Sequence, residues 1–295
     1  MNYKSIFKGL VLSFFVMVVA LMTGPPVLAD CSIEETPTGY SMICSGTILG
    51  EISGTDQEDI IHILPQATLL YYLTDSGDSL SEAMIIGIYG LQGNDEITND
   101  GDIQELQARA KTTAVGVSVT IDGTLEGDSS GAALSDSSAT ADASATGIDG
   151  GADNDTIDNQ AGISADAQAV VDATGVATDI TVTINGDASG ASLSDASVTA
   201  TSTATGIEGG EGDDTIDNEG DMEILATSDA VAVAVDVTID GTMEGDVAGE
   251  ALSDASATAD AMAIGIDGGT GIDEITNRGA IVGRADSSAT AVGVA

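Results

Sequence analysis

The chain has 295 residues and a formal net charge of −43, because it carries 49 acidic and only six basic side chains. Such a field repels nucleic acid and anionic membrane surfaces, which excludes both as partners. There is no Trp, the three Phe lie within the first 15 residues, and the last aromatic residue is Tyr89. The rest of the chain lacks the bulky rings on which compact cores depend, which favours an elongated fold with a thin core.

Residues 1–29 are typical of a secretory signal peptide. Lys4 and Lys8 precede an apolar stretch from Gly9 to Met22, and Val27-Leu28-Ala29 places small residues before an expected cleavage site after Ala29. No other segment is long and apolar enough to span a bilayer. We therefore expect a mature chain without a membrane span that is secreted or held at the cell surface.

Residues 30–86 differ in composition from the rest of the mature chain and contain both cysteines. In an exported protein we expect Cys31 and Cys44 to form a disulfide. A stack of repeats exposes unpaired strand edges at its ends, so this segment is predicted to be an N-terminal cap. It holds a weak copy of a glycine turn that recurs later in the chain, with Asp59 and Ile61 in register.

Residues 87–295 repeat with a nearly constant period. GLQGNDEIT, GGADNDTID, GGEGDDTID and GGTGIDEIT begin at Gly90, Gly150, Gly209 and Gly268, which are 60, 59 and 59 residues apart. The predicted repeats span 87–146, 147–205 and 206–264, followed by a truncated one at 265–295. A fixed period of this kind indicates one supersecondary unit stacked on copies of itself.

Between the turns the pattern has a period of two residues, which predicts strands. Alanines alternate with polar residues from Ala139 to Thr146, and β-branched residues occupy every second position from Val231 to Ile239. Alanine also favours helix, but frequent Val, Ile, Thr and Gly oppose it. We therefore predict an all-β fold, a parallel β-helix or β-solenoid of about 59-residue repeats in which small inward residues let two sheets approach closely.

Each repeat could form one large rung with two long strands or two rungs of about 30 residues. Thr215–Asn218 and Thr238–Gly241 resemble one strand-to-turn corner used twice, which favours two rungs. The similar strands VSVTIDG, ITVTING and VDVTIDG predict a four-residue displacement of the second copy, absorbed by loops. With two rungs, an ion at a glycine turn would need ligands from intervening turns at Gly127-Asp128, Gly186-Asp187 and Gly245-Asp246.

The glycine turns resemble the nonapeptide G-G-x-G-x-D-x-U-x of the RTX, or hemolysin-type calcium-binding, repeat proteins. The copies at Gly209 and Gly268 match every fixed position, whereas Leu91 and Asp153 each replace a glycine in the first two copies. In that family the turn binds Ca²⁺ through the aspartate and backbone carbonyls, and the next apolar residue points into a β-roll. The resemblance implies the ligands Asp95, Asp155, Asp214 and Asp273, the turn glycines Gly90, Gly93, Gly150, Gly209, Gly212, Gly268 and Gly271, and the buried residues Ile97, Ile157, Ile216 and Ile275.

The chemistry of the turn agrees with this implication. Ca²⁺ takes about 6–8 oxygen ligands, glycines with positive φ expose carbonyls, and bound cations offset the self-repulsion of an acidic chain. The alternative is that Gly and Asp occur here only because tight turns favour them. The chain also departs from the family, because its nonapeptides are not in tandem and its expected signal is N-terminal.

These features predict an exported, calcium-binding, repetitive structural or adhesin-like surface protein that is not an enzyme. The single histidine, His62, alternates with two isoleucines and is expected to face outward on a strand. One alternative is a β-helix polysaccharide lyase or hydrolase with paired carboxylates. Another is an ice-binding array, although the row Thr199, Thr201, Thr203 and Thr205 is not continued in the flanking repeats.

The sequence stops inside a strand pattern at Ala295, which suggests a fragment of a longer repeat protein. A missing C-terminal region would then hold the binding module for a surface or extracellular ligand.

Overall fold

The computed structural model describes residues 30–295, so the predicted signal peptide lies outside the described residues. The described chain consists of strands and turns, and within it no helix is long and apolar enough to cross a membrane.

Its strands form three sheets, here called A, B and C. Sheet A holds β1 (Asp30–Glu35), β2 (Tyr40–Ser45), β5 (Ile60–Ile63), β8 (Glu96–Asn99), β11 (Thr156–Asn159), β14 (Thr215–Asn218) and β17 (Glu274–Asn277). Sheet B holds β3 (Thr47–Leu49), β6 (Thr68–Gly77), β9 (Asp102–Glu126), β12 (Ile163–Asn185), β15 (Met222–Glu244) and β18 (Ile281–Val294). Sheet C holds β4 (Ile52–Ser53), β7 (Leu80–Tyr89), β10 (Ser129–Ala152), β13 (Ala188–Glu211) and β16 (Val247–Asp267).

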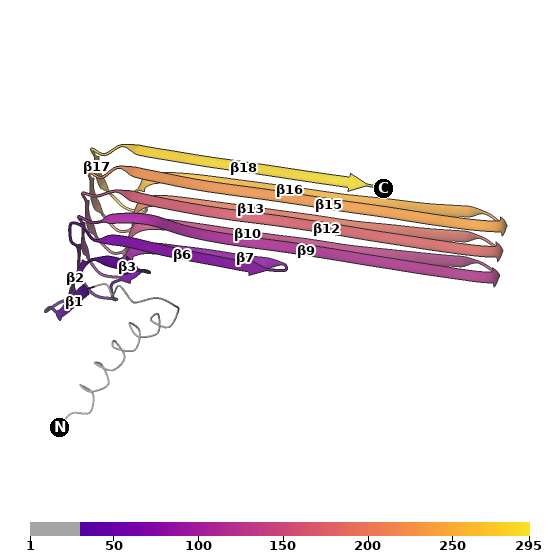
Figure 1. The fold of residues 1–295 in the computed structure, drawn as a ribbon, viewed down its shortest axis with the longest axis horizontal. Coiled ribbons are helices and arrows are strands. Elements are labelled where there is room, and N and C mark those ends of the chain that lie inside the picture. The colour runs from indigo at the N-terminus through magenta and orange to yellow at the C-terminus, as the bar shows by residue number, and fades with distance from the viewer. Residues whose placement is uncertain (1–29) are drawn as a thin grey trace, which may run out of the picture.

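The fold is a parallel β-solenoid with one large rung per repeat. The chain passes from a short strand of sheet A to a long strand of sheet B, turns back along sheet C, and enters the next rung (Figure 1). Residues one repeat apart pair in parallel, as Ile163 does with Ile103 and with Met222. The expectation of two rungs per repeat is therefore wrong. Thr238–Asp240 forms no corner, because it lies inside the 23-residue strand β15.

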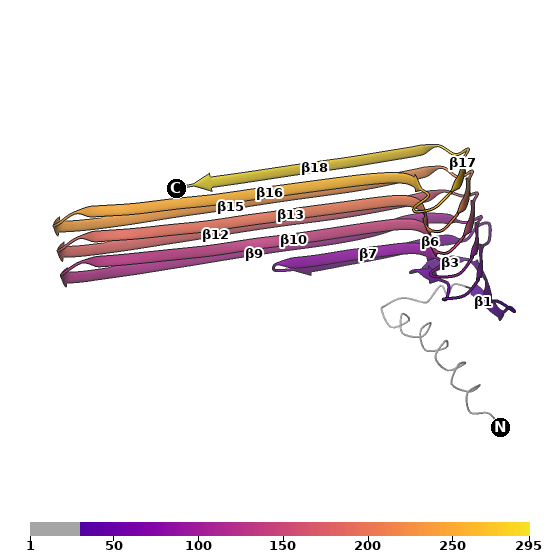
Figure 2. The same ribbon diagram turned by 180° about the vertical axis from the view of Figure 1, so that it is seen from behind.

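The far ends of the long strands are closed by two-residue tips, which both ribbon views place opposite the glycine turns (Figures 1 and 2). Gly127, Gly186 and Gly245 open these tips with φ of 97°, 133° and 143°. The predicted four-residue displacement does not occur, since Val182 pairs with Gly123 and with Gly241. At about 3.3 Å per residue, the tips lie roughly 75 Å from the glycine turns and cannot supply ligands to them.

The core near the glycine turns is thin and rich in alanine. Alternate residues of β12, from Ala165 to Val171, point inward and meet inward alanines of β13 such as Ala200 and Ala204. Ile97, Ile157 and Ile216 are fully buried behind sheet A, as predicted. Ile275 is 45% exposed, because β17 is the last strand of that sheet.

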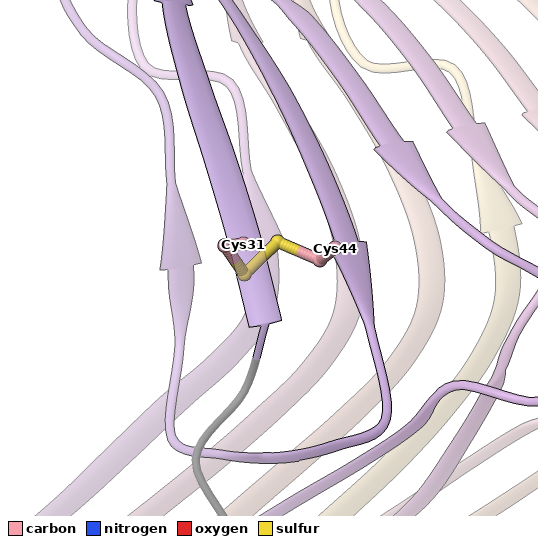
Figure 3. The surroundings of a disulfide bond; sticks show 2 residues. All are labelled: Cys31 and Cys44. Atoms are coloured by element: carbon pink, nitrogen blue, oxygen red, sulfur yellow. A yellow bond between two sulfur atoms is a disulfide. The ribbon is translucent and has the colours of Figure 1, made fainter.

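The segment before residue 87 contains shorter rungs of the same solenoid. β1 pairs antiparallel with β2 and closes the edge of sheet A, and the predicted Cys31–Cys44 disulfide joins these two strands (Figure 3). The boundary expected at 87 lies inside β7. In β6 and β7 the pairing with the next rung reaches only Thr112 and Thr140, so the short rung covers the half of β9 and β10 nearest the glycine turns.

Candidate calcium-binding turns

The glycine turns connect sheet C to sheet A and stack directly on one another. In this stack the backbone N–H of each turn aspartate donates to Oδ1 of the aspartate one rung further on. The distances are 2.7 Å from Asp59 to Asp95, 2.8 Å from Asp95 to Asp155, 2.8 Å from Asp155 to Asp214 and 3.1 Å from Asp214 to Asp273. We call these five residues the aspartate ladder. The structure thus brings all four predicted ligands together and adds Asp59 from the weak copy.

The second carboxylate oxygens of the ladder lack partners in the full repeats. Oδ2 of Asp95, Asp155 and Asp214 is buried without a hydrogen bond. Each faces the glycine that opens its own turn, since a Cβ on Gly90 or Gly150 would lie 2.5 or 2.7 Å from it. A Cβ on Gly209 or Gly268 would meet the same oxygen at 2.7 or 2.6 Å. The first glycine of the motif therefore makes room for the carboxylate of the same turn.

The weak copy shows what such an oxygen accepts when a partner is available. Oδ2 of Asp59 accepts hydrogen bonds from the backbone N–H and the hydroxyl of Thr55. At the equivalent position the full repeats carry Leu91, Gly151, Gly210 and Gly269. These residues have no hydroxyl, and no backbone N–H donates to Oδ2 of Asp95, Asp155 or Asp214, so these three oxygens remain available for a cation.

The turn keeps its backbone shape where the motif departs from glycine. Gly93, Gly212 and Gly271 have φ of 112°, 145° and 144°, and Gly210 has φ of 105°. The two substituted positions behave in the same way, because Leu91 and Asp153 adopt φ of 82° and 78°. A left-handed non-glycine residue costs about 1–2 kcal/mol. The stack therefore imposes the turn conformation on side chains that disfavour it.

Burial makes the charged form of the ladder unfavourable. The pKa of Asp95 and of Asp155 is raised to about 7, mainly by removal from water and also by neighbouring carboxylates, while a backbone hydrogen bond lowers it. Burial also raises the pKa of Asp214. A fully ionised ladder at neutral pH is thus poised to take up a proton or a cation.

The donor set suits a hard cation that is held largely by carbonyls. Among residues 30–295, no group of three or more His, Cys, Asp or Glu side chains is placed to hold a metal ion. A cation at these turns would use the free oxygens of Asp95, Asp155 and Asp214 together with carbonyls of the glycine turns. Oxygen-only coordination of this kind is the preference of Ca²⁺.

A second ladder, of asparagines, supports the turn and was not predicted from the sequence. Nδ2 of Asn99, Asn159 and Asn218 donates to Oδ1 of the next asparagine at 2.7, 2.6 and 2.7 Å, ending at Asn277. Asn159 and Asn218 also donate to the carbonyls of Ala161 and Gly220. The signal that could have revealed it is an asparagine four residues after the turn aspartate of each of the four nonapeptides, just beyond the nonapeptide's end.

The remaining candidate groups lie apart from the turns. His62 faces outward on β5, as predicted, with Nε2 2.9 Å from Oδ2 of Asp100. In the threonine row of β13, Thr201 lies between Asp142 and Asp260, and Thr203 lies between Ser144 and Met262. The row is interrupted on both sides and forms no regular array.

The fold and the stacked turns define a class, a parallel β-solenoid with one large rung per repeat and a glycine–aspartate corner in each rung. Comparison of the chain with protein-family models, curated proteins and solved structures finds no match.

Proposed function

We propose that the protein is an exported structural or adhesin-like surface protein whose solenoid corners are ordered by Ca²⁺. The observation that carries the calcium part is the set of buried, unpartnered Oδ2 atoms of Asp95, Asp155 and Asp214, stacked one rung apart. A cation at these atoms would replace the donors that Thr55 supplies to Asp59. It would also offset the repulsion within a chain of net charge −43.

The shape and surface of the solenoid support a structural or adhesive role. The long strands form a flat, extended, two-layered body (Figure 2). On the outer side of sheet B, far from the glycine turns, Val115, Val117, Val119 and Ile121 are 60–72% exposed. Val182, Ile184, Val237 and Ile239 continue this outer apolar face across the next two rungs. A contiguous exposed apolar surface of this kind marks a contact site, here one for a surface or extracellular ligand.

A calcium titration of the purified protein tests the proposal. Circular dichroism and thermal unfolding are followed from EDTA to millimolar Ca²⁺, with Mg²⁺ as the comparison ion. We expect β signal and Tm to rise with Ca²⁺ and to rise less with Mg²⁺, which gives up its water reluctantly. With free Ca²⁺ at 100 times Kd, one binding site raises the free energy of unfolding by about 2.7 kcal/mol.

Two double variants assign the effect to the turns. Asp155→Asn with Asp214→Asn removes two ladder charges and should abolish most of the calcium response. Asp128→Asn with Asp187→Asn is the matched control, because these exposed tip residues also join successive rungs through an N–H···Oδ1 bond. An unchanged spectrum and Tm up to millimolar Ca²⁺, or an equal loss in both double variants, would overturn the proposal.

A further inference from the structure

The interior of the solenoid changes character along the long strands. The distal half comprises residues 113–139, 172–198 and 231–257, which pair with one another across three rungs. Inward positions here include Asp, Ser and Thr among the alanines, such as the fully buried Asp179 and Thr181 and the nearly buried Asp236 and Ser192. The outward positions of the same strands carry the outer apolar face. Polar groups and alanines therefore share the narrow space between the sheets.

Three of the inward aspartates form a staggered row opposite glycines of sheet C, in which Asp179 lies two residues out of register with the other two. Asp122, Asp179 and Asp240 lie on three successive sheet-B strands. A Cβ on Gly190 would meet Oδ2 of Asp179 at 2.1 Å and Oδ1 of Asp240 at 2.5 Å. Likewise, a Cβ on Gly131 would meet Oδ1 of Asp179 at 2.3 Å and Oδ2 of Asp122 at 2.9 Å. Each neighbouring pair of carboxylates thus converges on one glycine, and Asp179 belongs to both pairs.

These carboxylates lack the partners that burial requires. Oδ1 of Asp179 and both side-chain oxygens of Asp240 have no hydrogen bond, although Asp179 is 0% exposed. Oδ2 of Asp179 accepts only from the Thr181 hydroxyl, at 2.9 Å. The Lys and Arg residues among 30–295 are Arg109, Lys111, Arg278 and Arg284, all outside the distal half. A buried carboxylate without a counter-charge is strongly unfavourable, and a bound cation would offset this cost.

We propose that this acidic row binds hard divalent cations of the Ca²⁺ type between neighbouring carboxylates, at one position between Asp122 and Asp179 and at another between Asp179 and Asp240. Two carboxylates converge at each position, and the hydroxyl of Thr181 adds a neutral oxygen beside Asp179. The chain's one His and its two cysteines lie at residues 31–62, outside the distal half, and oxygen-only sites select hard cations. The row lies about 50 Å along the strand from the glycine turns, so the inference does not rest on the turn site.

Counting bound ions in a chain without turn ligands tests the inference. The background variant carries Asp95→Asn, Asp155→Asn, Asp214→Asn and Asp273→Asn, and Ca²⁺ binding is measured by equilibrium dialysis against ⁴⁵Ca. We expect at least one Ca²⁺ per chain to remain. Adding Asp179→Asn should remove it or weaken its binding at least tenfold, whereas Asp195→Asn, which alters an exposed outward aspartate, should leave it unchanged.

A glycine variant tests the geometry without altering charge. Gly190→Ala should weaken the remaining binding at least threefold, because its Cβ would displace two of the carboxylates. Gly241→Ala is the control and should leave binding unchanged, because its Cβ would have no atom within 4 Å. In EDTA, Asp179→Asn should keep or raise Tm, since it removes a buried charge, and this readout shows that the variant is folded.

The row and the turns are separable in the outcome. If the background variant binds as many Ca²⁺ as the wild-type chain, and Asp179→Asn removes that binding, only the proposed function is overturned. Two results would overturn the acidic row as a cation site. One is equal Ca²⁺ binding with and without Asp179→Asn. The other is a background variant that unfolds cooperatively, and is therefore folded, but binds no Ca²⁺.

Discussion

The two halves of each long strand share one backbone but have opposite interiors. Near the glycine turns, β12 points Ala165, Ala167 and Ala169 inward, while farther along it points Asp179 and Thr181 inward. Inward parity is set at the corner where Ile163 enters the core, and an unbroken strand cannot change it. The polarity of the sequence switches near Val176, and the apolar positions then face outward. Alternation along a strand therefore defines two faces, and the residue that is buried at the corner determines which face points inward.

The same contrast separates two sets of stacked aspartates. Asp155 in the glycine turn and Asp187 at the far tip each accept a backbone N–H from the neighbouring rung through Oδ1, at 2.8 and 2.9 Å. Asp155 is buried and Asp187 is exposed. Identical hydrogen bonding thus carries different electrostatic consequences, because only the buried carboxylate loses its hydration.

The largest expected effect is a dependence of stability on pH in EDTA. An unfolded aspartate has a pKa near 3.9, whereas burial raises the pKa of folded Asp95 and Asp155 to about 7. Between these values the folded state binds more protons than the unfolded state, so stability falls as pH rises from about 4 to about 7. One pKa unit corresponds to about 1.4 kcal/mol.

Urea unfolding from pH 4.5 to 8 measures this dependence. Asp155→Asn should flatten the curve, and Asp187→Asn, the exposed counterpart, should leave its slope unchanged. A wild-type protein that gains stability with rising pH over this window would contradict the assigned burial of the ladder.

A matched pair of isoleucines compares the two regions directly. The tripeptide Thr-Ile-Asp occurs at 215–217 in a corner and at 238–240 in the distal half of β15. Ile216 is 1% exposed and Ile239 is 53% exposed. Ile216→Ala should cost about 2–5 kcal/mol through the lost burial and the cavity, whereas Ile239→Ala should change stability by about 0.5 kcal/mol or less. Equal costs in chemical denaturation would contradict the one-rung fold.

These isoleucines also show how far the sequence could predict the fold. Periodicity predicted strands, the fixed spacing predicted stacked repeats, and the weak copy placed Asp59 and Ile61 in register with the later turns, although Asp59 was not predicted as a ligand. The number of rungs per repeat depends on which distant strands pair. The tripeptide Thr-Ile-Asp occurs both in a corner and inside a strand, so it does not indicate this pairing. The acidic row escaped prediction for the same reason, because alternation is symmetrical between inward and outward faces.

A pair of glycines gives the next smaller effect. Gly210 has φ of 105°, and a Cβ there would lie 1.9 Å from the carbonyl oxygen of Gly151 in the preceding rung. Gly210→Ala should therefore cost about 1–3 kcal/mol from backbone strain, with the displaced carbonyl adding to it. Gly241→Ala has open space around it and should be neutral or stabilise by about 0.5 kcal/mol. A tolerated alanine at Gly210 would show that the turns do not stack closely.

The smallest effect on stability is expected on the outer apolar face. Val117→Thr, Val119→Thr and Ile121→Thr keep β-branched side chains on exposed strand positions, so circular dichroism should be unchanged and stability should move by about 0.5 kcal/mol or less per site. Retention on a hydrophobic-interaction column should nevertheless fall, because these side chains form accessible apolar surface. The inverse substitutions Thr199→Val, Thr201→Val and Thr203→Val on the outer side of sheet C should increase retention. A triple Thr variant of β9 that loses its fold instead would show that Val117, Val119 and Ile121 face the interior, and the inward acidic row would fall with that result.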